Sequence, residues 1–223
     1  MKIKKYDFIE LDYIGKIKEL NKIFDLTNEE AAKKNNLYNP NIKYSSIIIC
    51  VGLGSLVKGL DDALIGKEEK QYIIELAAEN AFGKKDPKLM KLVPTNIFKK
   101  QNIIPVPGLQ INIDGLMGTI RTVSGGRTII DFNHPLAGKN LIYEINIKRI
   151  LKDEKEKIKS FLEFYVKEPK FELKGSALAI NSEIKKQIQD GIAKKIKEIF
   201  PEIKTISFSN KESTTQKQPL KDN

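Results

Sequence analysis

The stretch that decides the fold comprises residues 47–64, which read IIICVGLGSLVKGLDDAL. Residues 47–51 are uninterruptedly apolar and are followed by glycine, which is typical of a buried strand. The glycines within 52–54 predict a tight turn, and Ser55 is placed to cap a helix that ends at Gly66. The apolar residues at helical spacing are Leu56, Leu60, Ala63 and Leu64. The stretch therefore predicts a strand, a turn and a short helix with one apolar face.

Strands with one apolar face are predicted on both sides of this stretch. Residues 6–13 alternate apolar and polar side chains, and residues 141–148 do the same. Residues 72–76 predict a further strand. Thr27 and Glu30 have the spacing of a capping box, which predicts a short helix there. The first part of the chain is therefore expected to have an α+β fold.

Residues 84–132 differ in character from the rest of the chain. Four prolines and five glycines break this stretch into short segments. The segments that favour β structure are 110–113, 118–123 and 128–132. The stretch therefore predicts a small β-rich module of its own.

A second change of pattern after Leu151 marks another boundary. Acidic residues within 153–156 suit the positive end of a helix dipole, and residues 171–180 predict one strand. Ser182 is expected to cap a second helix, and residues 203–208 predict a last strand. An α-β-α-β unit of about 60 residues has a marginal size for an isolated core. We therefore expect it to pack on a neighbour, and a homodimer through this unit is the simplest choice.

Length, charge and hydropathy limit the kinds of protein that this chain can be. The chain has 223 residues, with 39 basic and 29 acidic side chains and a formal charge of +10. This length suggests more than one folding unit. No run approaches the roughly 18 apolar residues of a membrane-spanning helix, and the charged N-terminus does not fit a signal peptide. We therefore expect a cytoplasmic protein that does not enter a membrane.

Cysteine and histidine are too rare for several kinds of chemistry. Cys50 is the single cysteine and His134 the single histidine, so the chain has no internal disulfide and no pair of the kind that zinc sites use. Cys50 lies in the apolar run 47–51 and is expected to be buried in a strand, not to act as a nucleophile. The sequence predicts no metal site.

The positive charge and the glycine turn do not predict a nucleotide ligand. Only three of the 39 basic residues are arginines, which base readout favours, and the lysines are spread along the chain. This pattern predicts a solvated surface, with non-specific proximity to a polyanion such as a ribosome as the alternative. A dinucleotide fingerprint would need a glycine where Val57 stands.

Three motifs, in order along the chain, carry a family resemblance. They read GLGSLVKGLDDAL at 52–64, ENAFG at 79–83 and HPLAGKNL at 134–141. Together they resemble the FKBP-type peptidyl-prolyl cis-trans isomerases, over residues 6–150. The module at 84–132 stands where the SlyD branch of that family carries an insert-in-flap chaperone domain. The C-terminal extension resembles the long-chain archaeal FKBPs.

The resemblance implies a division into domains. Residues 1–83 with 133–150 would form an FKBP-like domain, in which an antiparallel sheet wraps a short helix. Residues 84–132 would form the inserted β-rich domain, and residues 151–208 a C-terminal domain of mixed α and β structure. Residues 209–223 contain almost no apolar side chain and are expected to be a disordered tail.

The resemblance also implies an apolar pocket for a prolyl group. Its residues would be Tyr13, Phe24, Asp25, Ile47, Leu56, Val57, Leu60, Phe82 and Tyr143. For each residue alone, an ordinary place in the core is the competing interpretation, but the charge of Asp25 between apolar neighbours favours a functional site. The family usually has a large aromatic at Leu60 and tyrosine at Phe82. We therefore expect weak binding of macrolide inhibitors and low activity on short peptides.

The function implied is that of a peptidyl-prolyl cis-trans isomerase, or rotamase, that needs no cofactor. Its partners would be unfolded or nascent polypeptides that contain proline. The inserted module would hold these clients through apolar residues that a small module cannot all bury. These residues are Met90, Leu92, Ile97, Phe98, Ile103, Ile104 and Val106. The competing interpretation assigns them to the module's own core. The alternative function is a holding chaperone with little isomerase activity that is associated with ribosomes.

Overall fold

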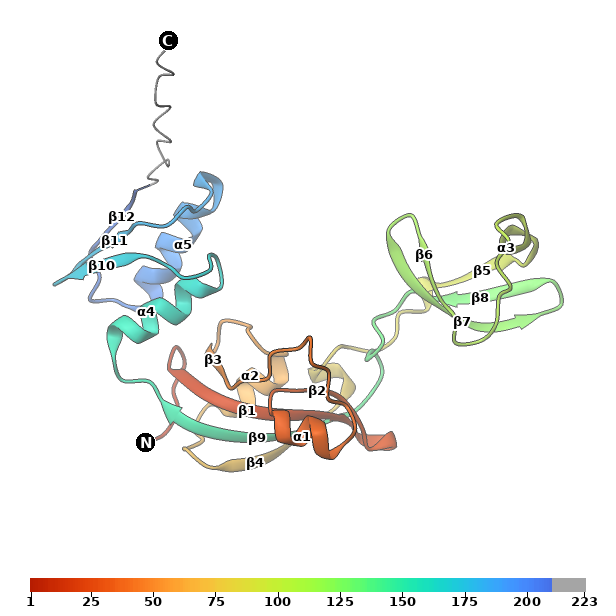
Figure 1. Ribbon diagram of the computed structural model, residues 1–223, viewed down its shortest axis with the longest axis horizontal. Coiled ribbons are helices and arrows are strands. Elements are labelled where there is room, and N and C mark those ends of the chain that lie inside the picture. Colours follow the sequence, from red (N-terminus) through yellow and green to blue (C-terminus); the bar gives the residue numbers. More distant parts are fainter. Residues whose placement is uncertain (210–223) are drawn as a thin grey trace, which may run out of the picture.

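The computed structural model describes residues 1–209, so the predicted disordered tail lies, from residue 210 on, outside the described residues (Figure 1). The elements of the first region are β1 (Phe8–Ile17), η1 (Lys18–Leu20), β2 (Lys22–Leu26), α1 (Glu29–Lys34), β3 (Ile47–Cys50), α2 (Lys58–Leu64), β4 (Gln71–Leu76), η2 (Ala78–Asn80) and β9 (Leu141–Ile150). No helix among the described residues is long and apolar enough to cross a membrane.

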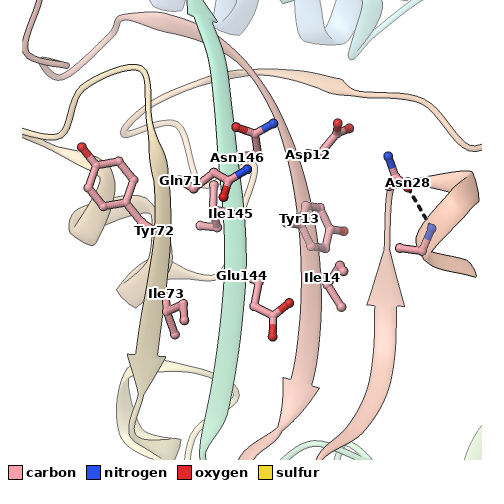
Figure 2. A pocket seen from close by; sticks show the side chains of 11 residues that line it. Asp12, Tyr13, Ile14, Asn28, Gln71, Tyr72, Ile73, Glu144, Ile145 and Asn146 are labelled. Carbon is pink, nitrogen blue, oxygen red and sulfur yellow. Dashed lines mark hydrogen bonds between the residues drawn. The ribbon is translucent and has the colours of Figure 1, made fainter. Parts of the chain in front are cut away.

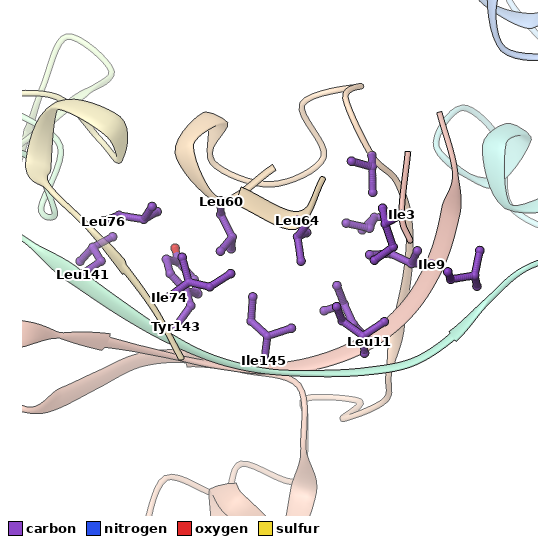
Figure 3. Close-up of a cluster of buried hydrophobic side chains, with 14 of the residues drawn as sticks. Ile3, Ile9, Leu11, Leu60, Leu64, Ile74, Leu76, Leu141, Tyr143 and Ile145 are labelled. Carbon is purple, nitrogen blue, oxygen red and sulfur yellow. The ribbon is translucent and has the colours of Figure 1, made fainter. Parts of the chain in front are cut away.

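A five-stranded antiparallel sheet forms the centre of this region. Its strand order is β2-β1-β9-β4. The fifth strand, β3, pairs with residues 8–11 of β1, on the same edge of β1 as β2. The sheet curves around α2, whose Leu60 and Leu64 face Tyr143 and Ile145 of β9 (Figure 3). This arrangement agrees with the α+β class and with an antiparallel sheet wrapped on a short helix.

Three predicted helix caps are wrong. α2 begins at Lys58 and has Val57 at its N-cap without a side-chain bond, so Ser55 lies in the turn before it. The N-cap of α1 is Asn28, whose Oδ1 accepts a hydrogen bond from the amide of Ala31. Thr27 instead accepts a hydrogen bond from the amide of Tyr13 in β1 and so joins two strands. Ser182 bonds the backbone of Lys170 and caps no helix. For Thr27 and Ser182 a tertiary contact competes with the local cap.

The inserted region forms a sheet of its own. Its elements are η3 (Pro87–Leu89), β5 (Met90–Pro94), α3 (Asn96–Lys100), β6 (Gln110–Ile113), β7 (Leu116–Ser124) and β8 (Arg127–Asp131). The strand order is β5-β8-β7-β6, and the core consists of Phe98, Ile111, Ile120 and Ile130. In Figure 1 this sheet stands away from the central sheet and is joined to it by two linking segments.

Asp131 ties the two linking segments together. Its side chain is 1% exposed and pairs with Lys85 at 2.7 Å and with Arg121 at 3.0 Å. Both the amide and the side chain of Asn133 also donate to this carboxylate. Burial opposes ionisation, but the bonds from Lys85, Asn133 and Arg121 outweigh it and hold the pKa of Asp131 well below its usual range. The charged form of Asp131 therefore stabilises the junction.

The C-terminal region contains one strand more than predicted. Its elements are α4 (Glu154–Glu163), β10 (Phe171–Lys174), β11 (Ala177–Ile180), α5 (Lys186–Ile199) and β12 (Thr205–Phe208). The single strand predicted at 171–180 is a hairpin that turns at Gly175, where φ is +56°. β11 and β12 are parallel, so the helix α5 serves as their crossover.

This C-terminal region packs on β1 and β3 of the central sheet. Phe8 of β1 and Cys50 of β3 are fully buried in the same apolar cluster as Phe161 and Ile196. The ring of Phe8 stacks on that of Phe200 at 5.8 Å. The C-terminal region was expected to pack on a neighbour, and that neighbour is the central sheet of the same chain. The homodimer stays a prediction. Cys50 is buried as predicted, and burial raises the pKa of its thiol to about 12.

Replacing Phe8 tests how strongly the two regions depend on each other. Phe8→Ala should lower the free energy of unfolding by about 3–5 kcal/mol, because it leaves a cavity between the central sheet and the C-terminal helices. Urea denaturation followed by circular dichroism measures this loss. Ile73→Ala, at an exposed position of β4, should stay within about 0.5 kcal/mol of wild type. Equal effects of the two changes would contradict the packing described.

Asp131→Asn should weaken the junction in a pH-dependent way. The native pKa lies below the unfolded value of about 3.9, so the stabilisation is full above that pH and is lost progressively as the pH falls from it toward the lower native pKa. We expect a loss of about 2 kcal/mol at pH 7 and a smaller difference from wild type at pH 3. Thermal unfolding at the two pH values measures it, with the exposed Glu172→Gln as control. A difference that grows on acidification would overturn the assignment.

Candidate functional site

The three aromatic residues predicted for the pocket meet on one side of the central sheet. Tyr13 comes from β1, Phe24 from β2 and Tyr143 from β9. The rings of Phe24 and Tyr143 meet edge to face, with centroids 5.9 Å apart and planes at 88°. The rings of Tyr13 and Tyr143 lie 6.0 Å apart. Such edge contacts fix the rings in one arrangement, which gives the cluster a rigid aromatic side.

Gly15 makes this arrangement possible, and the sequence analysis missed it. It lies in β1 opposite both Asp25 of β2 and Tyr143 of β9. A Cβ atom at this position would come within 2.7 Å of the Phe24 ring. The absence of a side chain therefore lets the ring lie flat against the strand and reach Tyr143.

α2 and the segment before it supply further residues of the predicted pocket. Leu60 is buried, and Leu56 and Val57 are half-buried and pack against the same cluster. Ile47 at the start of β3 also packs there. The structure thus brings together seven of the nine predicted residues in one apolar cluster: Tyr13, Phe24, Ile47, Leu56, Val57, Leu60 and Tyr143.

A buried carboxylate that was not predicted fixes the turn before α2. Asp61 is 4% exposed and accepts hydrogen bonds from the backbone amides of Gly52 and Gly54 at 3.0 and 3.1 Å. Both glycines have positive φ angles, +89° and +74°, so other residues would be strained there. The turn that carries Leu56 and Val57 is therefore held to the helix by charge-assisted bonds.

Asp25 is connected to this cluster through one hydrogen bond. The hydroxyl of Tyr13 donates to Oδ2 of Asp25 at 2.5 Å, and the aspartate is exposed. Burial and the bond to Asp25 raise the pKa of Tyr13, and burial and the charge of Asp25 raise that of Tyr143 to about 12. Both phenols therefore keep their protons at neutral pH, and Tyr13 acts as a hydrogen-bond donor.

Phe82 lies apart from the seven clustered residues. Its ring is 37% exposed and stacks on His134, with centroids 4.3 Å apart and planes at 3°. Nδ1 of His134 accepts a hydrogen bond from the amide of Leu136, which assigns the proton of a neutral ring to Nε2. His134 follows the insert in sequence, so this stack joins both ends of the inserted segment. The sequence analysis used His134 only as part of a motif and missed this contact.

A hollow lies elsewhere, against the other face of the sheet. It measures about 530 Å³ and is bordered by α1 and by strands β1, β9 and β4. Figure 2 shows Gln71, Asn146 and Asp12 gathered along it. Asp12 is paired with Lys148, and Glu144 with Lys16. Of the predicted pocket residues only Tyr13 borders this hollow, and its two carboxylates are paired with lysines.

The described residues offer no arrangement for metal or nucleophilic chemistry at the apolar cluster. No group of three or more histidine, cysteine or acidic side chains could hold an ion within residues 1–209. The groups that the cluster presents are phenols, a phenyl ring, aliphatic side chains and one carboxylate. Such a site can bind an apolar ring and orient polar atoms at its rim.

The insert exposes most, but not all, of the apolar residues predicted for client binding. Ile104 is 81% exposed and Leu92 is 59% exposed, and Ile97 and Val106 are also exposed. The prediction for Phe98 is wrong, because its side chain is 4% exposed and forms the core of the insert. Met90 is half-buried, and Ile103 is half-buried against that core. The prediction omitted two residues at the start of β7, Leu116 and Met117, which are also exposed.

The insert matches a known family of domains, and the chain is similar in sequence to several known proteins. Residues 91–136 match the family described as FKBP26, IF domain. A short-type peptidyl-prolyl cis-trans isomerase of Methanocaldococcus jannaschii is 33% identical over 155 residues, which cover 69% of this chain and 98% of that protein.

Two bacterial relatives agree with this match. A probable FKBP-type 16 kDa peptidyl-prolyl cis-trans isomerase of Pseudomonas fluorescens is 34% identical, over 44% of this chain and 67% of the relative. The FKBP-type peptidyl-prolyl cis-trans isomerase SlyD of Escherichia coli strain K12 is 30% identical, over 48% of this chain and 57% of the relative. Given these relatives, the central sheet around α2 and the insert match, the chain belongs to the FKBP-type peptidyl-prolyl cis-trans isomerases and is a SlyD-like rotamase.

Proposed function

We propose that the apolar cluster over the central sheet is the pocket in which an Xaa-Pro bond is isomerised, and that the insert holds the client chain. The observation that supports this most is the meeting of Tyr13, Phe24 and Tyr143 over Leu60, with Asp25 bonded at the rim. These side chains come from three strands and one helix, of which α2 and β9 lie far from β1 and β2 in the sequence.

The reaction suits a site without a nucleophile or cofactor. Rotation about an Xaa-Pro bond breaks amide resonance, which sets a barrier of about 18–20 kcal/mol. The twisted amide is less polar than the planar one, so a pocket with little water favours the transition state over the ground state. Leu60 would form the floor of the pocket under the proline ring, with Phe24 and Tyr143 as its walls.

Asp25 would act on the polar part of the twisted bond. Its carboxylate is held by the Tyr13 hydroxyl and is exposed at the rim, so it can face a client backbone. As the amide twists, charge on the carbonyl and on the prolyl nitrogen changes, and a fixed charge nearby can stabilise that change. Phe82, held by His134, would cover the pocket from the side of the insert.

The insert would keep unfolded client chains near this pocket. Four of the predicted residues, Leu92, Ile97, Ile104 and Val106, expose apolar surface, and Leu116 and Met117 add to it. Exposed apolar groups of this kind are typical of surfaces that bind other chains. Tethering a client to the insert raises its effective concentration at the pocket, so proteins should be better substrates than short peptides.

A holding chaperone with little isomerase activity is the second candidate function. Phe82 carries no hydroxyl that could bond a client carbonyl, and Leu60 is small for a pocket floor. Both features would weaken the pocket without affecting the exposed surface of the insert. Association with ribosomes and a homodimer rest only on net charge and on the size of the C-terminal region, and they stay predictions.

Phe24→Ala and Asp25→Ala test the pocket. Each change should lower kcat/KM for an Xaa-Pro tetrapeptide by about tenfold, because a wall of the pocket or the rim charge is lost. A protease-coupled isomerisation assay measures the rate. Ile73→Ala on the exposed part of β4 is the matched control and should retain the wild-type rate. If both pocket variants stay within twofold of wild type, the pocket lies elsewhere.

Leu92→Ser combined with Ile104→Ser tests the insert. Both side chains are exposed, so the double variant should fold and lose apolar surface for clients. We expect the ratio of activity on an unfolded protein to activity on a tetrapeptide to fall about tenfold. Leu20→Ser with Ile65→Ser, at exposed positions outside the insert, is the control pair. An unchanged ratio in the insert variant would remove the insert from the proposal.

A further inference from the structure

A small hollow lies between the turn before α2 and the C-terminal helices. It measures about 190 Å³ and is lined by residues 53–55 on one side and by Phe161, Phe164, Tyr165 and Lys195 on the other. Leu53 and Phe161 of its lining also belong to the apolar cluster that joins the C-terminal region to β1 and β3, so the hollow lies at the edge of that contact. A cavity of about 150 Å³ with apolar walls is large enough for a benzene ring.

Two aromatic rings beside the hollow are left in solvent. Phe164 is 54% exposed and Tyr165 is 41% exposed, although both follow the buried Phe161 at the end of α4. The ring of Tyr165 packs on that of Phe161 at 5.5 Å, which holds it at the edge of the hollow. Adjacent aromatic rings that stay exposed next to a hollow are typical of a surface that binds another chain.

The segment that lines one side of the hollow leads along the chain into the proposed prolyl pocket. Residues 53–55 line the hollow, and the next two residues, Leu56 and Val57, belong to the pocket cluster. Leu53 and Val57 are four residues apart in sequence, so about 14 Å is the most that can separate their backbones. Because Asp61 bonds the amides of Gly52 and Gly54, this segment is fixed to α2.

We propose that the hollow binds an apolar side chain, preferentially aromatic, of the same client polypeptide whose proline occupies the pocket. This inference rests on the function proposed above and specifies its substrates. A client residue within about five positions of the proline can span the distance between the two sites. Lys195 at the rim offers an ammonium group to an acidic neighbour of that residue. The preferred clients thus carry an aromatic residue, flanked by an acid, near the proline.

A peptide series tests this proposal. Each peptide contains one Xaa-Pro bond and either phenylalanine or serine at a position three to six residues before or after the proline. With the wild-type chain, we expect kcat/KM at the best position to be about fivefold higher for phenylalanine than for serine. Phe164→Ser should reduce this ratio to about one, since the substitution removes the Phe164 ring from the lining of the hollow.

Ile188→Ser is the matched control for Phe164→Ser. Ile188 is 42% exposed in α5 and does not line the hollow, so its replacement should leave the fivefold ratio unchanged. A wild-type ratio near one at all positions would overturn the proposal, and so would a Phe164→Ser ratio equal to that of wild type. If the proposed isomerase function itself is wrong, the result differs, because the wild-type chain would then accelerate neither the phenylalanine nor the serine peptides.

Discussion

The pairing of β1 with β9 is the interaction on which the rest of the structure depends. β1 also pairs with β2 and β3, and a bulge between Glu10 and Leu11 shifts its register against β9. One face of this ribbon supplies Ile9 and Leu11 to the core under α2, and the other supplies Phe8 to the cluster that holds the C-terminal region. Further along, Tyr13 reaches the aromatic group at the proposed pocket. A single ten-residue strand, β1, therefore positions residues of both the proposed pocket and the contact with the C-terminal region.

The chemistry of the family explains why so few reactive groups suffice. Prolyl isomerisation makes no covalent bond, so a pocket needs shape, low polarity and one or two fixed charges. Asp25 and the Tyr13 hydroxyl supply such a polar pair, and aromatic edge contacts fix the walls. In the proposals made above, the insert and the C-terminal region add surfaces to which longer client segments bind. The proposed division of labour follows from this arrangement, with catalysis at the sheet and affinity at the flanking surfaces.

The sequence predicted the fold class and a group of residues of which seven cluster over the central sheet, because both predictions depend on local pattern and motif. Alternating side chains identified the long strands, and the motif at 52–64 identified the helix under the sheet. Helix caps were wrong at Ser55, Thr27 and Ser182, since each is decided by which backbone group lies nearby in the folded chain. Phe98 looked available to clients but is the core of the insert. Gly15, Asp61 and the stack of His134 on Phe82 matter through contacts between distant segments, which no local pattern shows.

The most direct test of the account is the rate of a proline-limited refolding reaction with the wild-type chain and with the double variant Asp25→Ala, Phe82→Ala. Both side chains are exposed, so the variant should keep its fold and its insert. We predict that wild type accelerates refolding and the variant does not, whereas both suppress aggregation of the same client equally. Acceleration by the variant at the wild-type rate would contradict the account, because catalysis would then not depend on the pocket over the central sheet.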